Sequence, residues 1–129
     1  MRLEQAQQNG ELLLQQAKWR EALPFLGCAF ETVEILMELY QGEADILVSK
    51  LTSLTVLLTS CLEKLECSEH AKIVFAQSYS SLNQLLANEE SSSASRTHLK
   101  VCMQSLRANQ SSSDQLFLAM FEDSSQALH

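Results

Sequence analysis

Apolar residues recur at steps of three and four along most of the chain, which is the spacing of helices with one buried face. The first stretch predicts a helix from about Leu3 to Ala17, because it also lacks β-branched residues. A longer apolar stripe predicts a second helix that starts near Arg20 or Glu21, since Pro24 is tolerated best in a first turn. Gly42 is expected to end this helix.

Two further helices follow in the sequence. A ladder of leucines from Leu47 to Leu65 predicts a helix over 43–65, and its pattern is the clearest in the chain. A fourth helix is expected to have Ser68 as its N-cap and to end near Asn88. A core is expected where the four helices meet, made of Leu13, Trp19, Ala22, Leu26, Ala29, Leu54, Leu58, Phe75 and Leu82.

The last third of the chain is more polar. The run from Asn88 to Ser95 has no large apolar side chain, which predicts a mobile linker at 89–95. Apolar spacing resumes at Leu99–Leu106 and again at Leu116–Phe121, which predicts two more short helices. The predicted organisation is a core of four helices in two hairpins (1–88), the linker, and a helical pair (96–129) that packs on the core or on a second copy.

Six residues of the first two helices follow a recognisable order. A small and a large residue on the first helix precede an aromatic at the turn, and small, large and small residues follow on the second helix: Gly10, Leu13, Trp19, Ala22, Leu26 and Ala29. This order resembles the tetratricopeptide repeat, over a length of about one repeat. The resemblance implies that the small residues let the two helices approach closely and that the large residues fill the groove between pairs of helices.

A second, weaker match places Ala71, Phe75 and Ser78 where the first has Ala22, Leu26 and Ala29. The two matches lie 49 residues apart, whereas the family uses about 34. Longer helices are therefore required, and the Pro that commonly follows the second helix in the family is absent here. The predicted fold class is all-α with about five to six helices, in antiparallel hairpins stacked as a short tetratricopeptide-like array or, alternatively, as an irregular bundle.

Composition narrows the range of partners. The formal charge of −7 and a pI near 4.8 make binding to a phosphate backbone unfavourable, so nucleic acid is not expected as a partner. The polar stretch Met1–Gln8 lacks the apolar region of a signal peptide, and Ile46–Leu58 is interrupted by Ser, Thr and Lys. We therefore expect a cytoplasmic protein without a membrane span and with its cysteines reduced.

Motifs that carry catalysis are absent from the sequence. There is no phosphate-binding glycine loop, no H-E-x-x-H and no EF-hand loop, so no catalytic residue and no cofactor is assigned and enzymatic activity is not expected. Cys61, Cys67 and His70 are close enough in sequence to consider a metal site, but they lack paired ligands at short spacing, and no metal is assigned. Cys28 falls within the apolar stripe of the second helix, where burial is expected.

Two groups of residues are candidates for partner binding. An acidic band around the end of the second helix could complement a basic segment. It consists of Glu31, Glu34 and Glu38, which are the candidate binding residues, and of Glu43 and Asp45. Phe117, Met120 and Phe121 belong to a short stretch that is apolar on more than one face, which predicts a homodimer whose contact includes Phe117 and Phe121.

The leading functional hypothesis is a non-catalytic interaction module, a scaffold or adaptor that binds a protein partner's peptide or helix on a helical groove. The alternative is a small acidic export chaperone of the flagellar or type III secretion kind, which would hold an apolar client helix. A third class is a small regulatory enzyme or metal protein built on Cys61, Cys67 and His70.

Overall fold

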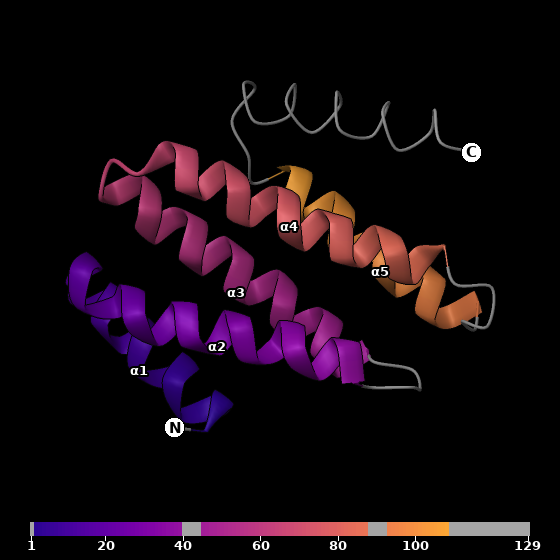
Figure 1. Ribbon diagram of the computed structural model, residues 1–129, viewed down its shortest axis with the longest axis horizontal. Helices are drawn as coiled ribbons and strands as arrows, with labels where there is room; N and C mark the ends of the chain where they lie inside the picture. The colour runs from indigo at the N-terminus through magenta and orange to yellow at the C-terminus, as the bar shows by residue number, and fades with distance from the viewer. Residues whose placement is uncertain (1, 40–44, 88–92, 109–129) are drawn as a thin grey trace.

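The computed structural model describes residues 2–39, 45–87 and 93–108, and these residues form five helices joined by short connections. The helices are α1 (Leu3–Gln15), α2 (Trp19–Leu39), α3 (Asp45–Lys64), α4 (Ser68–Leu86) and α5 (Ser93–Ala108) (Figure 1). No strand occurs among the described residues. The prediction of an all-α fold made of helical hairpins is therefore confirmed.

Each helix packs mainly against its neighbours in sequence. α1 lies against α2, α2 against α3 and α3 against α4, while α5 packs on both α3 and α4. In Figure 1, α2, α3 and α4 lie next to one another across the view, with α5 behind α4. α3 is thus the central helix, because it touches all four of the others.

The two hairpins, α1–α2 and α3–α4, turn in the same way. Ala17 has a φ of 58° and Glu66 a φ of 61°, and these two residues lie 49 positions apart. In the first turn the Lys18 N–H donates to the Leu13 carbonyl at 2.9 Å, and in the second the Cys67 N–H donates to the Leu62 carbonyl at 2.8 Å. Both turns are Schellman motifs, in which a left-handed residue lets two N–H groups reach back to free helix carbonyls.

The same 49-residue shift relates buried residues of the two hairpins. Ala22 and Ala71 are buried at the start of the second helix of each hairpin, and Leu26 and Phe75 are buried one turn later. The weaker match noted in the sequence therefore marks a real geometric correspondence. The first hairpin has Gly10 where α1 meets α2, and a Cβ built on it would lie 2.6 Å from Leu26 Cδ2. The close approach implied by the resemblance is present at this point.

Another contact between the two helices, one turn away in the second hairpin, is polar. Thr55 and Ser78 are fully buried, and their hydroxyl oxygens lie 2.7 Å apart between α3 and α4. Thr55 Oγ1 donates to the Leu51 carbonyl at 2.6 Å, so Ser78 is the donor of the bond between the two side chains. The positions that correspond to Thr55 and Ser78 in the first hairpin are Ala6 and Ala29, which are also fully buried.

Most of the expected core is buried. Seven of the nine predicted core residues have less than 5% of their surface exposed, namely Ala22, Leu26, Ala29, Leu54, Leu58, Phe75 and Leu82. Leu13 and Trp19 are only partly buried, and they pack against the edge of this core. The prediction for Cys28 is wrong, because Cys28 is exposed. α2 carries two apolar stripes, and Cys28 belongs to the outward one.

α5 begins inside the predicted linker. Ser93, Ala94 and Ser95 are helical, and Ser95 is buried and donates to Asp45 Oδ1 at 2.9 Å. The linker prediction is wrong at these three residues, because serine is well suited to a helix N-terminus and Ser95 has a partner on α3. The remainder of the predicted linker, 88–92, lies outside the described residues. The chain from residue 109 onward, which includes the predicted sixth helix, also lies outside them.

Two helix boundaries also differ from the predictions. α1 ends at Gln15 because the backbone turns left-handed at Ala17. The N-cap of α4 is Cys67 rather than Ser68, which is the first helical residue, and no side chain caps this end.

α3 has the length and composition of a helix that could cross a membrane, with a mean hydropathy of 1.5 over its most apolar window. Its buried residues include Leu51, Leu54 and Leu58, which belong to the same core as side chains of α2, α4 and α5. A central core helix meets the same criteria of length and hydropathy. Localisation in the cytoplasm stays a prediction.

Candidate functional site

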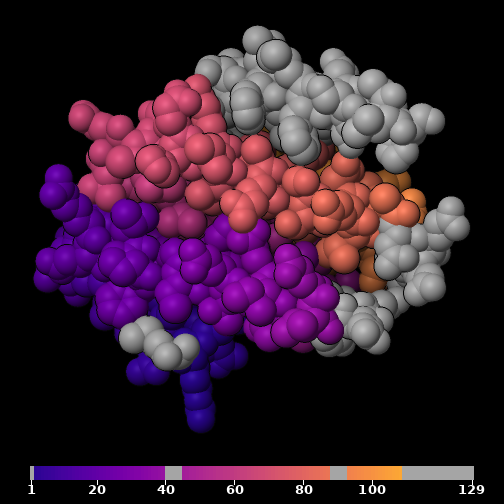
Figure 2. Space-filling model, viewed as in Figure 1, coloured from indigo at the N-terminus to yellow at the C-terminus, as the bar shows by residue number. Residues whose placement is uncertain are grey.

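The acidic residues predicted from the sequence lie on one side of α2. Glu31, Glu34 and Glu38 are spaced by three and four positions, which places them on one helix face. Glu31 and Glu38 are exposed, whereas Glu34 is half-buried. This face borders α4, whose side chains meet those of α2 across the front of the molecule (Figure 2).

Gln77 of α4 fixes the central carboxylate of this band. Its Nε2 donates to Glu34 Oε1 at 3.0 Å and to Oε2 at 2.9 Å. Burial raises the pKa of the Glu34 carboxyl above its usual value, and the negative charges of Glu31 and Glu38 raise it further, while the bond from Gln77 lowers it. Glu34 therefore has an unfavourable environment for its charge, and a cationic side chain placed beside it would relieve this.

Glu34 and Glu38 line a shallow pocket of about 180 Å³ between α2 and α4. The other lining residues are Met37 from α2 and Ser81, Gln84 and Leu85 from α4. The pocket therefore combines two carboxylates with apolar side chains and neutral hydrogen-bonding groups. We call these six residues together with Glu31 and Gln77 the acidic groove.

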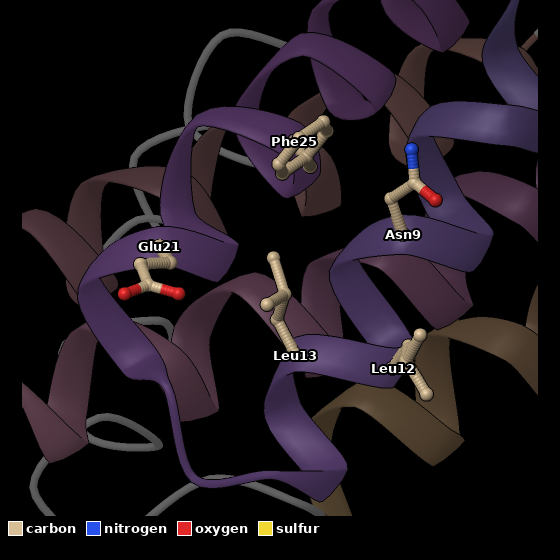
Figure 3. Close-up of a pocket in the computed structure, with 5 residues that line it drawn as sticks. All are labelled: Asn9, Leu12, Leu13, Glu21 and Phe25. Carbon is tan, nitrogen blue, oxygen red and sulfur yellow. The ribbon is translucent and has the colours of Figure 1, made fainter.

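A second and larger pocket lies in the first hairpin, near the turn between α1 and α2. It has a volume of about 520 Å³ and is lined by Asn9, Leu12 and Leu13 of α1 and by Glu21 and Phe25 of α2. Figure 3 shows Leu13 pointing from α1 toward the space between Glu21 and Phe25. Leu12 is 53% exposed at its edge. We call these five residues the first-hairpin pocket; its lining is mostly apolar, with Glu21 as its single charged residue.

The third candidate group cannot be placed. Phe117, Met120 and Phe121 lie outside the described residues. The contact that the sequence predicts for Phe117 and Phe121 therefore stays a prediction.

The cysteine and histidine residues that suggested a metal site have separate surroundings. Cys61 is buried, its Sγ donates to the Trp19 carbonyl at 3.0 Å, and burial raises the pKa of its thiol. Cys67 is half-buried and His70 is exposed. Within residues 2–39, 45–87 and 93–108, no three His, Cys, Asp or Glu side chains are grouped so as to hold a metal ion.

One further histidine links two helices. His98 Nε2 of α5 lies 2.9 Å from Ser49 Oγ of α3 and 3.7 Å from Cys102 Sγ. The Ser49 contact runs beside the Ser95–Asp45 hydrogen bond and joins the same two helices. We interpret this pair of contacts as the polar seam that holds α5 on α3.

Sequence reasoning found the carboxylates of the acidic groove but missed its α4 side. Gln77, Ser81 and Gln84 carry no distinctive motif, and the 49-residue correspondence is the signal that could have placed α4 beside α2. The first-hairpin pocket was not predicted, because Leu12 and Phe25 belong to no motif in the sequence. Their position at an edge depends on tertiary packing.

Fold and site together define a class, that of all-α helical-hairpin proteins with an acidic groove on one face. No family model matches the chain, and neither a curated protein nor a solved structure shows significant similarity to it.

Proposed function

We propose that this chain is a non-catalytic protein-interaction module, built as a short tetratricopeptide-like array, and that its acidic groove binds a basic segment of a protein partner. The observation that carries the proposal is Glu34, which is half-buried, fixed by Gln77 and flanked by two more carboxylates. Charged groups in such a position favour an oppositely charged partner.

The lining of the groove suits a helix or an extended peptide as ligand. Met37 and Leu85 provide apolar contact between the carboxylates of α2 and the polar residues of α4. A Lys or Arg ammonium or guanidinium group would bond to Glu34 or Glu38, while an apolar side chain of the same segment covers Met37 or Leu85. The tetratricopeptide-like description is supported by the close contact at Gly10 and by the repeated hairpin geometry.

A synthetic amphipathic peptide with Lys on one face and Leu on the other tests this proposal. We expect Glu34→Gln combined with Glu38→Gln to weaken its binding by about tenfold, which corresponds to about 1.4 kcal/mol. Glu63→Gln combined with Glu69→Gln is the matched control, because both residues are exposed carboxylates away from the groove. Fluorescence anisotropy at two salt concentrations measures the effect. An equal loss in both double variants would mean unspecific attraction to an acidic chain and would refute the proposal.

The export-chaperone alternative is supported by a different feature, the apolar lining of the first-hairpin pocket. A chaperone of that kind would bind an apolar helix, and its affinity would depend on Leu12 and Phe25 rather than on Glu34. The same anisotropy experiment with an uncharged Leu-rich peptide distinguishes the two functions. If Phe25→Ser no longer bound that peptide while Glu34→Gln bound it as the wild type does, the result would favour the chaperone function.

A further inference from the structure

The outer side of α2 carries a second apolar stripe that no helix of the described chain covers completely. Phe25, Cys28, Thr32, Ile35 and Leu39 follow one another at steps of three, four, three and four residues, which is the spacing of a coiled-coil seam. Ile35 is 57% exposed and Leu39 is 72% exposed. Leu36, beside Ile35 on the same helix, is 40% exposed.

The second hairpin provides an internal comparison for this stripe. The 49-residue shift takes Phe25, Cys28, Thr32 and Ile35 of α2 to Val74, Gln77, Ser81 and Gln84 of α4. Three of the four α4 residues are polar, and these three, Gln77, Ser81 and Gln84, border the acidic groove beside α2. The same backbone position is therefore polar in one hairpin and apolar in the other, so the stripe is not a requirement of the hairpin geometry.

α1 leaves part of α2 uncovered. α1 has 13 residues whereas α2 has 21, and α3, the equivalent of α1 in the second hairpin, has 20. Leu85, which corresponds to Leu36, packs against the core and is only partly exposed. Leu36 at the end of α2 is thus more exposed than the matching Leu85 of α4.

The stripe, with Leu36 added to it, is self-complementary about Thr32 except at Ile35, because Ile35 lies three residues after Thr32 and Ala29, three residues before it, is buried. Phe25 lies seven residues before Thr32 and Leu39 seven residues after it, while Cys28 and Leu36 lie four residues before and after. Two antiparallel α2 helices related by a two-fold axis at Thr32 would place Leu39 of each against Phe25 of the other. Phe25 borders the first-hairpin pocket, so the exposed leucine at one end of the stripe would enter the pocket at the other end.

Charge and hydrogen bonding fit this arrangement. Between Phe25 and Leu39 the stripe has no charged residue, although the chain as a whole carries a formal charge of −7. Glu34 lies on the side of α2 that faces α4. Glu31 and Glu38 lie four residues before and three residues after Ile35, so they form a charged border along one edge of the stripe. Thr32 Oγ1 donates to the Cys28 carbonyl at 2.8 Å, so its hydroxyl proton already has an acceptor and can be buried without loss.

We propose that the α2 stripe is a self-association surface, on which a second copy of this chain packs its own α2 in antiparallel orientation. The contact differs from the one that the sequence predicts at Phe117 and Phe121. It also leaves the acidic groove of each copy open, because the groove lies on the other flank of α2.

Sedimentation equilibrium of the full chain at tens of micromolar tests the proposal. We expect the mass of two 14.4 kDa chains for the wild type, and a single-chain mass for Ile35→Glu combined with Leu39→Glu. Ile73→Glu combined with Val101→Glu is the control, because these two apolar residues are also exposed but lie on α4 and α5; it should stay dimeric. Circular dichroism confirms that each variant keeps its helices.

Cross-linking locates the two-fold axis. In a Cys28→Ser background, Thr32→Cys should form a disulfide-linked dimer under mild oxidation, whereas Ser81→Cys at the matching position of α4 should not. A monomeric wild type, a dimer that survives the Ile35 and Leu39 substitutions, or equal cross-linking at both positions would each overturn the proposal. Dissociation by Phe117→Asp with Phe121→Asp, but not by the α2 substitutions, would move the contact to the C-terminal segment instead.

Discussion

The two hairpins have one backbone design and two different interiors. In α1–α2 the helices meet through side chains without polar groups, chiefly Ala6, Gly10 and Ala29. In α3–α4 the equivalent positions hold Thr55, Thr59 and Ser78, which are buried and hydrogen-bonded. The difference shows that a helix pair of this geometry can be closed either by small residues or by hydroxyl groups whose hydrogen bonds are satisfied internally.

The largest effect is expected at a position where the hairpins agree. Ala22→Leu and Ala71→Leu should each lower the free energy of unfolding by about 1 to 3 kcal/mol, because both methyl groups are buried and the added atoms would overpack the hairpin. Urea unfolding followed by circular dichroism measures the change. A neutral result at Ala22 would remove the main support for the repeat-like interpretation.

The hydroxyl pair of the second hairpin should behave as a unit. Thr55→Val keeps the shape of the side chain but leaves Ser78 without the bond at 2.7 Å, and should cost about 1 to 2 kcal/mol of unfolding free energy. Ser78→Ala should lower the free energy of unfolding less in the Thr55→Val background than in the wild type. Strict additivity in this double-mutant cycle would contradict the coupling.

Gly10 tests how tightly the first hairpin is closed. Gly10→Ala gains about 1 kcal/mol from helix propensity, but its Cβ would overlap with the Leu26 side chain. We expect the overlap to outweigh the gain and to lower the free energy of unfolding by about 1 kcal/mol net. In a Leu26→Ala background the same substitution should become stabilising. If Gly10→Ala stabilises the otherwise unchanged chain, Leu26 has room to move and the contact is looser than described.

The smallest effect concerns charge. Glu34 has a raised pKa in the folded chain, because its charged form is disfavoured by burial and by Glu31 and Glu38. The stabilisation that accompanies this raised pKa is therefore fully present below the usual pKa of 4.5. It is lost as the pH rises through the pKa of the folded state. Glu34→Gln should show a smaller decrease in unfolding free energy than the wild type across this window. If the unfolding free energies of Glu34→Gln and of the wild type fell in parallel from pH 4 to pH 7, this prediction would be wrong.

The sequence predicted the helices well because their apolar residues keep helical spacing even where polar residues surround them, as from Leu47 to Leu65. The sequence predicted the start of α5 too far toward the C-terminus, because a run of serines is typical both of linkers and of helix N-termini. Neither turn contains glycine, so the left-handed residues Ala17 and Glu66 gave no signal.

The candidate site was predicted only in part. The carboxylates of α2 are visible as a band in the sequence, whereas the groove depends on α4, whose Gln77 lies 43 positions beyond Glu34. Cys28 was misassigned because a helix with two apolar stripes has the same local spacing as a helix with one broad stripe. Which stripe faces the core is decided by the packing of the other helices.

The central place of α3 has a consequence for the order in which the molecule opens and closes. Most helices contact their neighbours in sequence, so the loops that folding must close are short and their entropic cost is small. We therefore expect refolding in microseconds to milliseconds, as for other chains of low contact order. α3 touches four helices, so its amide protons should exchange with solvent only through global unfolding, whereas those of α1 should exchange when α1 alone detaches from α2.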